Sequence, residues 1–251
     1  MSGAPTLVVF AGQSNAVGFG MSPATLPAHL SQPNPNAYIF DGNYWGVLTP
    51  GVNTGTAINP QAWGPEAQFA YDFGVQRPGE LLLIVKNTFT VKGSTPLAQD
   101  GGLDWSPTTL GEMFDFTDVT IAAAKQAFTS ATGQPAPAVS ATFWMQGEQD
   151  ALSATHAAAY QTNFEAWLAA VRSDWMDNPQ GYIGAGRITD SAALPHNADV
   201  RVAQWAADQV DPNLATFKTI GFGMQPDTVH YDASGLQALG SAFFTLFDGW
   251  F

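Results

Sequence analysis

The stretch that decides the fold is TLVVFAGQSN at residues 6–15, where an unbroken apolar run stops abruptly at a polar turn. Apolar runs without alternation are typical of strands that are covered on both faces of a parallel sheet. Four later runs are nearly unbroken in the same way, at residues 81–85, 138–144, 182–188 and 217–221. The sequence therefore predicts a sheet of five parallel strands.

Helical patterns lie between or after these runs. The clearest covers residues 154–175, whose bulky apolar side chains fall on one stripe. Further helices are predicted at about residues 65–75, 118–130, 200–210 and 236–247. Strands that alternate with helices predict an α/β fold, a three-layer α/β/α sandwich with a doubly wound sheet.

We expect one domain over residues 1–251, because this length suits a single α/β unit. Pro, Gly and Asn residues concentrate at about residues 32–55 and 94–111, which are predicted to be long loops. Loops of that length in a compact domain usually border a functional site.

Charge and composition limit the partners of the chain. Eight Lys and Arg against 21 Asp and Glu give a formal net charge of −13, which repels nucleic acid and anionic lipid surfaces. The chain has no cysteine, so a disulfide scaffold and a thiolate nucleophile are excluded. No apolar stretch approaches the roughly 20 residues of a spanning helix, and residues 1–11 do not resemble a signal peptide. We expect a soluble protein without a nucleic-acid or membrane partner; its compartment and oligomeric state stay open.

Polar clusters follow three of the five predicted strands. They are GQSN at residues 12–15, QGEQD at residues 146–150 and DTVH at residues 227–230. Because a doubly wound sheet gathers its reactive groups at the carboxyl ends of its strands, we expect the three clusters to share one rim.

Ser14 and His230 are the candidate nucleophile and general base. A serine at a strand-to-helix junction can expose its hydroxyl, although the same place also suits a helix N-cap. Asp227 precedes His230 by three residues, so it can accept the Nδ1 hydrogen and leave Nε2 free to take the serine proton. These residues predict a catalytic triad in the chain order Ser, Asp, His. Such chemistry needs no metal and no cofactor, and the sequence has no His-x-x-x-His pair that predicts zinc.

Gln146 and Glu148 stand at the end of a buried strand, where polar side chains are costly unless they are hydrogen-bonded. The amide of Gln146 can donate to an oxyanion. Glu148 has two possible roles: it can orient His230 in place of Asp227, or it can support the serine loop. Reach to Nδ1 favours Asp227 as the triad acid.

The polar clusters resemble those of the sialate O-acetylesterase and acetylxylan esterase family of carbohydrate esterases, within the SGNH hydrolase superfamily. The segments WMQGEQD at residues 144–150, WGPE at 63–66 and VRVAQ at 200–204 extend the resemblance over nearly the whole chain. It implies a five-stranded, flavodoxin-like parallel sheet and a serine esterase without a metal.

The same resemblance assigns further residues. It implies an oxyanion hole formed by the N–H groups of Ser14 and Gly93 with the amide of Gln146, although Ser94 stands where the family has a second glycine. The remaining supporting or substrate-binding residues are Gln13, Asn15, Glu66, Glu148 and Arg201.

The expected function is removal of O-acetyl groups from carbohydrates through an acetyl-serine intermediate. The acidic chain suits acetylated xylan or other neutral sugars better than sialic acid, unless Arg201, Lys86 or Lys92 binds a carboxylate. Two alternatives are an SGNH lipase or thioesterase that acts on other acyl esters, and a glycan-binding module without catalysis.

Three tryptophans fall in the predicted loops, where an aromatic ring can either stack on a sugar or pack the loop against the core. They are Trp45, Trp63 and Trp105.

Overall fold

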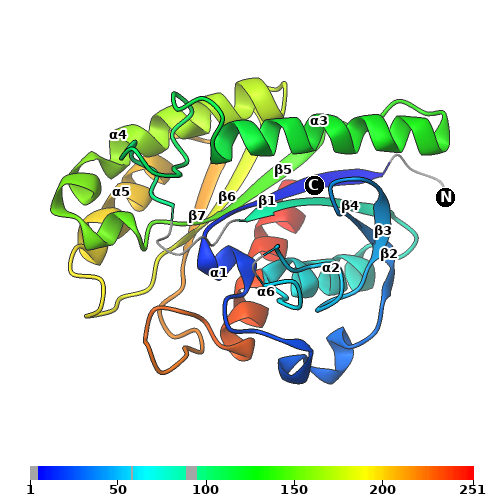
Figure 1. The fold of residues 1–251 in the computed structure, drawn as a ribbon, viewed down its shortest axis with the longest axis horizontal. Coiled ribbons are helices and arrows are strands. Elements are labelled where there is room, and N and C mark those ends of the chain that lie inside the picture. The colour runs from blue at the N-terminus through cyan, green and yellow to red at the C-terminus, as the bar shows by residue number, and fades with distance from the viewer. Residues whose placement is uncertain (1–4, 58, 89–94) are drawn as a thin grey trace.

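The computed structural model describes residues 5–57, 59–88 and 95–251, and it confirms the three-layer α/β/α fold (Figure 1). Its middle layer is a seven-stranded sheet in the order β3-β2-β4-β1-β5-β6-β7. The strands are β1 (Thr6–Gly12), β2 (Asn34–Phe40), β3 (Trp45–Leu48), β4 (Leu82–Thr88), β5 (Val139–Met145), β6 (Tyr182–Arg187) and β7 (Leu214–Lys218).

The five predicted strands are β1, β4, β5, β6 and β7, and each is parallel to its neighbours. Their order, β4-β1-β5-β6-β7, is the flavodoxin-like order in which the first strand lies second. Only β7 is misplaced by the sequence prediction, which put it at residues 217–221. The chain already leaves the sheet at Thr219, whose hydroxyl donates to the carbonyl of Arg187.

The predictions of five strands, of a wholly parallel sheet and of a loop over residues 32–55 are wrong. β2 pairs in parallel with β4, and β3 pairs antiparallel with β2. The turn between them is closed by Asp41, whose carboxylate accepts the N–H groups of Asn43 (2.8 Å) and Tyr44 (2.9 Å). Pro35 and the asparagines beside it conceal β2 in the sequence, since both residue types are depleted in strands.

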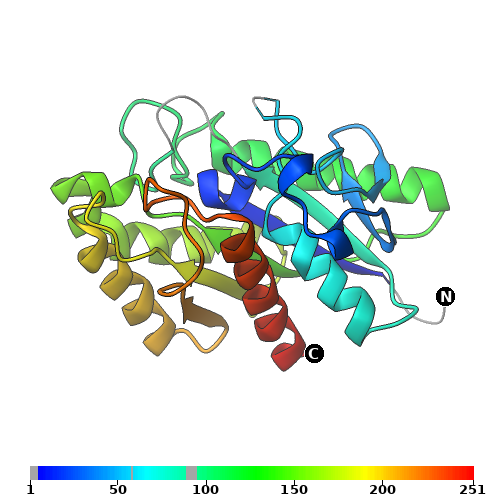
Figure 2. The same cartoon turned by 90° about the horizontal axis from the view of Figure 1, so that it is seen from below.

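Helices cover both faces of the sheet (Figures 1 and 2). α2 and α6 pack against each other on one face, whereas α3, α4 and α5 lie on the other. The helices are α1 (Ser14–Val17), α2 (Pro65–Gln76), α3 (Met113–Thr132), α4 (Ala154–Ala170), α5 (Asn197–Val210) and α6 (Ala233–Trp250). A π-helical turn, Val171–Trp175, continues α4, so the helical pattern at residues 154–175 is confirmed over its full extent. None of these helices in the described part of the chain is both long and apolar enough to cross a membrane.

Aromatic side chains fill the core on both faces of the sheet. Between the sheet and helices α2 and α6, the rings of Phe10, Phe69 and Phe143 lie 4.8 to 5.3 Å apart. On the other face, Trp144 packs on Trp167 at 4.0 Å. Full burial of one such side chain stabilises the fold by about 1.5–3 kcal/mol. The ends of β1 and β5, from which the site is built, are therefore rigidly held.

Candidate active site

Ser14 lies where β1 ends beside β5. Gly12 has a φ of +139°, and a Cβ there would lie 2.1 Å from the carbonyl oxygen of Met145, so this approach requires glycine. The N–H of Gln13 donates to that carbonyl at 3.0 Å. The polar clusters at residues 12–15 and 146–150 consequently leave the sheet side by side.

The nucleophile candidate begins a short helix. Ser14 is the first residue of α1, so its N–H has no acceptor within that helix. Its side chain is mostly covered, with 6% of the residue exposed. Gly18, in the left-handed conformation with a φ of +87°, ends the helix against the carbonyl of Trp63.

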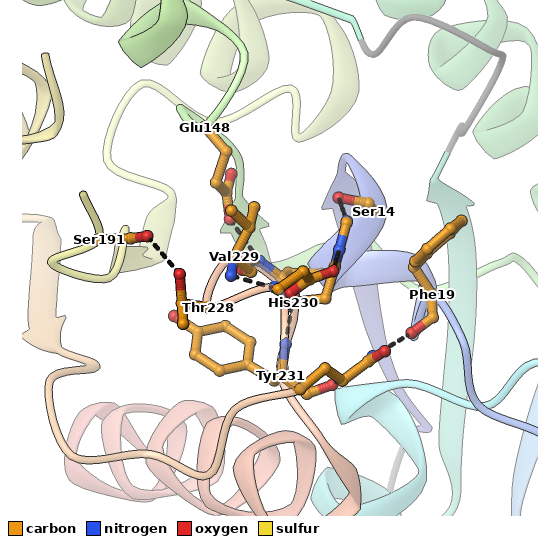
Figure 3. A network of polar contacts seen from close by, with 11 residues as sticks. Ser14, Phe19, Glu148, Ser191, Thr228, Val229, His230 and Tyr231 are labelled. Carbon is orange, nitrogen blue, oxygen red and sulfur yellow. Dashed lines mark hydrogen bonds and ion pairs between the residues drawn. The ribbon is translucent and has the colours of Figure 1, made fainter. Parts of the chain in front are cut away.

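His230 lies beside Ser14 (Figure 3) and connects it to Asp227. Its Nε2 lies 3.0 Å from Ser14 Oγ, and its Nδ1 lies 2.6 Å from Asp227 Oδ2. The other oxygen of Asp227 accepts the backbone N–H groups of Val229 (3.0 Å) and His230 (2.9 Å), which folds residues 227–230 into a closed turn. The hydroxyl oxygen of Ser14 therefore lies within proton-transfer distance of the imidazole of His230.

The charge on Asp227 determines how the imidazole is protonated. Partial burial raises the pKa of this carboxyl, but the hydrogen bonds from the ring of His230 and from the N–H groups of His230 and Val229 bring it below its ordinary value of 3.8. The ionised carboxylate can only accept, so the hydrogen of neutral His230 is at Nδ1. Nε2 is then free to accept the proton of Ser14.

Asn15 joins the serine turn to the histidine loop. Its Nδ2 donates to the carbonyl of Val229 at 3.0 Å, and its Oδ1 accepts the N–H of Tyr231 at 3.0 Å. These two backbone groups lie immediately before and after His230. One side chain, adjacent to Ser14 in sequence, thus sets the position of the loop that carries the imidazole.

Glu148 holds Asn15 in turn, as its Oε1 accepts the Nδ2 hydrogen at 2.6 Å. The residue is 2% exposed, and its Oε2 has no partner among the described residues. Burial raises the pKa of Glu148, and the hydrogen bond from Asn15 only partly opposes this. Of the two roles that the sequence left open, the contacts of Glu148 match support of the serine loop, while Asp227 occupies Nδ1 of His230.

Gln146 is not directed toward Ser14. Its residue is fully buried, and its Nε2 donates to Asp150 Oδ2 (2.5 Å) and to the carbonyl of Thr95 (3.2 Å), while its Oε1 accepts from Tyr160. Both amide hydrogens are therefore used inside the protein. The expectation that Gln146 donates to an oxyanion does not fit this geometry. Gly93, the other expected donor, lies outside the described residues.

Glu66 and Lys86 form a buried ion pair behind the serine turn. Lys86 Nζ lies 2.8 Å from Glu66 Oε1, and it also donates to the carbonyl groups of Val17 (3.1 Å) and Thr54 (2.8 Å). Burial lowers the pKa of Lys86, while the charge of Glu66 opposes the shift. The pair supports the end of α1, so Lys86 is not available for a substrate carboxylate.

Gln13 and Arg201, also expected at the site, occupy different places. Oε1 of Gln13 accepts the N–H groups of Gly147 (3.3 Å) and Gln149 (3.4 Å), which ties the two strand ends together. Arg201 forms an ion pair with Asp190 at 3.3 Å. It lines a surface hollow of about 350 Å³ together with Arg187, Trp205 and Lys218. Lys92 lies outside the described residues.

The sequence analysis missed two residues, Phe19 and Gln225, that border the Ser14–His230 dyad. The ring of Phe19 lies 4.4 Å from the imidazole of His230, with an angle of 34° between the two planes. Gln225 Nε2 donates to the carbonyl groups of Phe19 (2.7 Å) and Tyr231 (3.0 Å). The only signal for Phe19 was its place directly after the glycine that ends α1.

The tryptophans that were candidates for sugar stacking pack the loops instead. Trp63 and Trp105 are fully buried, and their indole N–H groups donate to Thr25 (3.0 Å) and Thr95 (3.1 Å). Trp45 is partly buried and donates to the carbonyl of Ala124.

Among the described residues, no group of three or more acidic or histidine side chains could hold a metal ion.

A model of one protein family matches residues 5–247, and its description reads carbohydrate esterase, sialic acid-specific acetylesterase. No curated protein sequence matches the chain. Among solved structures, a protein of Arabidopsis thaliana is similar with a TM-score of 0.75 and 17% identity, and the match covers 98% of each chain. NanS is similar with a TM-score of 0.68 and 15% identity, again over 98% of each chain.

A carbohydrate acetylesterase from Xanthomonas citri is similar with a TM-score of 0.59 and 17% identity. The match covers 94% of this chain and 54% of that protein. At these identities, the likeness to solved structures shows a common fold.

Proposed function

The chain belongs to the carbohydrate esterase family of sialic acid-specific acetylesterases, and we propose that Ser14, His230 and Asp227 are the triad with which it removes O-acetyl groups from sugars. The single observation that carries this proposal is the line of hydrogen bonds from Asp227 through His230 to Ser14 Oγ. The three proposed residues come from two distant segments of the chain, and His230 lies within hydrogen-bond distance of both of the others.

In the proposed reaction, His230 Nε2 takes the hydroxyl proton of Ser14 as Oγ attacks the acetyl carbonyl carbon. The tetrahedral intermediate collapses when the bond to the sugar oxygen breaks, and His230 returns the proton to that oxygen. Water then attacks the acetyl-serine with the same base, which releases acetate and restores Ser14. Asp227 stabilises the imidazolium at each proton transfer.

The N–H of Ser14, which has no acceptor inside α1, is the oxyanion donor that the geometry favours. Gly93 stays the proposed second donor on the family resemblance. A donor of this type contributes about 2.7–4 kcal/mol to transition-state stabilisation. Gln146 has no oxyanion role in this scheme, because its amide hydrogens are donated to Asp150 and to the carbonyl of Thr95.

For the substrate we favour neutral acetylated sugars, such as acetylated xylan, over acetylated sialic acid. The net charge of −13 disfavours anionic ligands. Lys86 is engaged by Glu66, and Arg201 by Asp190, so neither is a free partner for a sialic acid carboxylate.

The test is release of free acetate from acetylated xylan, acetylated glucose and acetylated sialic acid, with Ser14→Ala as the control. We expect release by the wild-type protein, fastest on a neutral sugar, and none above background by Ser14→Ala. Binding of these sugars without release of acetate from any of them would instead indicate a glycan-binding module. Faster hydrolysis of octanoyl than of acetyl esters would indicate a lipase or thioesterase.

A further inference from the structure

Phe19 is an exposed aromatic ring that borders the Ser14–His230 pair. The residue is 44% exposed, and its ring packs against the imidazole at a tilt, with 4.4 Å between the centroids. Figure 3 shows Phe19 on the side of the dyad away from Glu148 and Ser191. Single exposed apolar side chains are common on protein surfaces, but this ring lies against the imidazole, where its exposed part can contact a ligand bound at Ser14.

The backbone of Phe19 is fixed to both halves of the dyad. Its N–H donates to the carbonyl of Ser14 at 3.0 Å, and its carbonyl accepts from Gln225 at 2.7 Å. The backbone carbonyl of Gln225 also accepts the N–H of Thr228, and the backbone N–H of Gln225 donates to the carbonyl of His230 at 2.8 Å. The ring therefore keeps its place relative to Ser14 and His230.

Proton transfer fixes which part of a substrate comes near this ring. His230 Nε2 must return its proton to the leaving oxygen, which therefore has to lie within hydrogen-bond distance of Nε2. The leaving sugar then lies beside the imidazole. Phe19 packs against the same imidazole and is partly exposed, so its ring is the candidate contact for that sugar.

Resting on the proposed esterase function, we propose that Phe19 is a specificity-determining residue whose exposed ring supports the ring of the leaving sugar. The C–H face of a sugar ring is apolar and stacks on aromatic rings, whereas a small alcohol has no such face. The contact distinguishes esters by the alcohol that leaves and not by the acyl group. It fills the role that the buried Trp63 and Trp105 cannot take.

The experiment compares two esters that share the acetyl group, an acetylated methyl xyloside and ethyl acetate, in wild type and in Phe19→Leu. Aromatic contacts of this type predict that the ratio of kcat/KM for the xyloside to kcat/KM for ethyl acetate falls about three- to tenfold in Phe19→Leu, through a higher KM for the xyloside. Phe19→Trp, which keeps an aromatic face, should retain the preference for the xyloside. Phe116→Leu is the matched control, since Phe116 is 47% exposed on α3 and does not border the dyad.

Equal losses on both esters, with an altered pH profile, would overturn the proposal, because Phe19 would then act only by positioning His230. Unchanged kinetics on both esters would overturn it as well. Failure of the esterase function itself is distinguishable from these results. In that case wild type releases no acetate from ethyl acetate, or Ser14→Ala releases it at the wild-type rate.

Discussion

The side chain of Asn15 is hydrogen-bonded to the backbone on both sides of His230, to the carbonyl of Val229 and to the N–H of Tyr231. The residue that follows the proposed nucleophile therefore also positions the proposed base. Any displacement of the histidine loop changes the distance between Ser14 Oγ and His230 Nε2, which is 3.0 Å in the intact structure. Asn15 is a positioning residue in this arrangement.

Replacement of Asn15 by alanine removes both of these bonds and the bond to Glu148. We expect kcat on ethyl acetate to fall about 10²-fold, because misplacement of a base by about 1 Å has an effect of this size. The free energy of unfolding should fall by about 1–3 kcal/mol, as the N–H of Tyr231 loses its acceptor. Steady-state kinetics and urea unfolding measure the two effects. Asn213→Ala, which removes an exposed bond to Gln180, is the control, and an Asn15→Ala variant with wild-type kcat would contradict this role.

Ser14→Ala and His230→Ala should each reduce kcat about 10⁵- to 10⁶-fold and leave the circular dichroism spectrum unchanged. The double variant should lose no more than either single variant, because the members of a catalytic unit are not additive. Acetate release under saturating substrate measures this. Substantial activity in either single variant would remove the basis of the triad.

Asp227→Asn and Glu148→Gln distinguish the two candidate acids. Asp227→Asn should lower kcat about 10²- to 10⁴-fold, because the amide cannot stabilise the imidazolium and can reverse the ring tautomer. Glu148→Gln should retain most activity, since its Oε1 can still accept the hydrogen bond of Asn15. If Glu148→Gln is the more impaired enzyme while both remain folded, the assignment of the acid is reversed.

The buried carboxyl of Glu148 also predicts a pH dependence of stability. Its pKa in the folded protein is raised by burial above the ordinary value of 4.5. Just above that pH the unfolded chain releases a proton that the folded protein keeps, so the free energy of unfolding contributed by this group falls as the pH rises.

Glu148→Gln has no such proton, and its stability relative to wild type should increase as the pH rises above 4.5. Titratable groups that do not interact with Glu148 are common to both proteins and cancel in the difference. Thermal unfolding at a series of pH values gives the result. A difference that stays constant or shrinks would show that Glu148 is not protonated preferentially in the folded state.

The free energy of unfolding should fall more when one partner of the buried Lys86–Glu66 pair is lost than when both are lost. Lys86→Met leaves the carboxylate of Glu66 without its cation, which should cost about 3–5 kcal/mol of unfolding free energy. The double variant Lys86→Met with Glu66→Gln should recover much of this loss. Chemical denaturation of the wild-type protein, Lys86→Met, Glu66→Gln and the double variant gives the coupling between the sites, and additive losses would argue against a coupled pair.

The sequence was sufficient to predict the strands that carry the site because their signals are local. β1 and β5 are nearly unbroken apolar runs that end at Gly12 and at Met145, and such runs have few other interpretations. The spacing of Asp227 and His230 likewise needs only one turn of chain to bring the carboxylate to Nδ1.

The hairpin of β2 and β3 was missed because its signals conflict. Pro35 and the neighbouring asparagines argue against a strand, while the Asp41-Gly42 pair between Phe40 and Trp45 is a hairpin signal that would have found it. β2 tolerates the proline because only its last part, Ala37 to Ile39, pairs with β4.

The sequence could not predict the direction of the side chains of Gln146 and Phe19. Gln146 was expected in a polar network, but an amide hydrogen serves a carboxylate as well as an oxyanion, and Asp150 is the acceptor that the fold supplies. Phe19 has no periodicity to mark it, since its place beside His230 depends on a contact with Gln225 from the far end of the chain.

The hydrogen bond between Ser14 and His230 joins residues that are 216 positions apart. Contacts of such long range form late, because the entropy of closing the intervening chain must first be offset by the packing of the sheet and its helices. Esterase activity during refolding should therefore return after the burial of the tryptophans, and its recovery would report completion of the native topology.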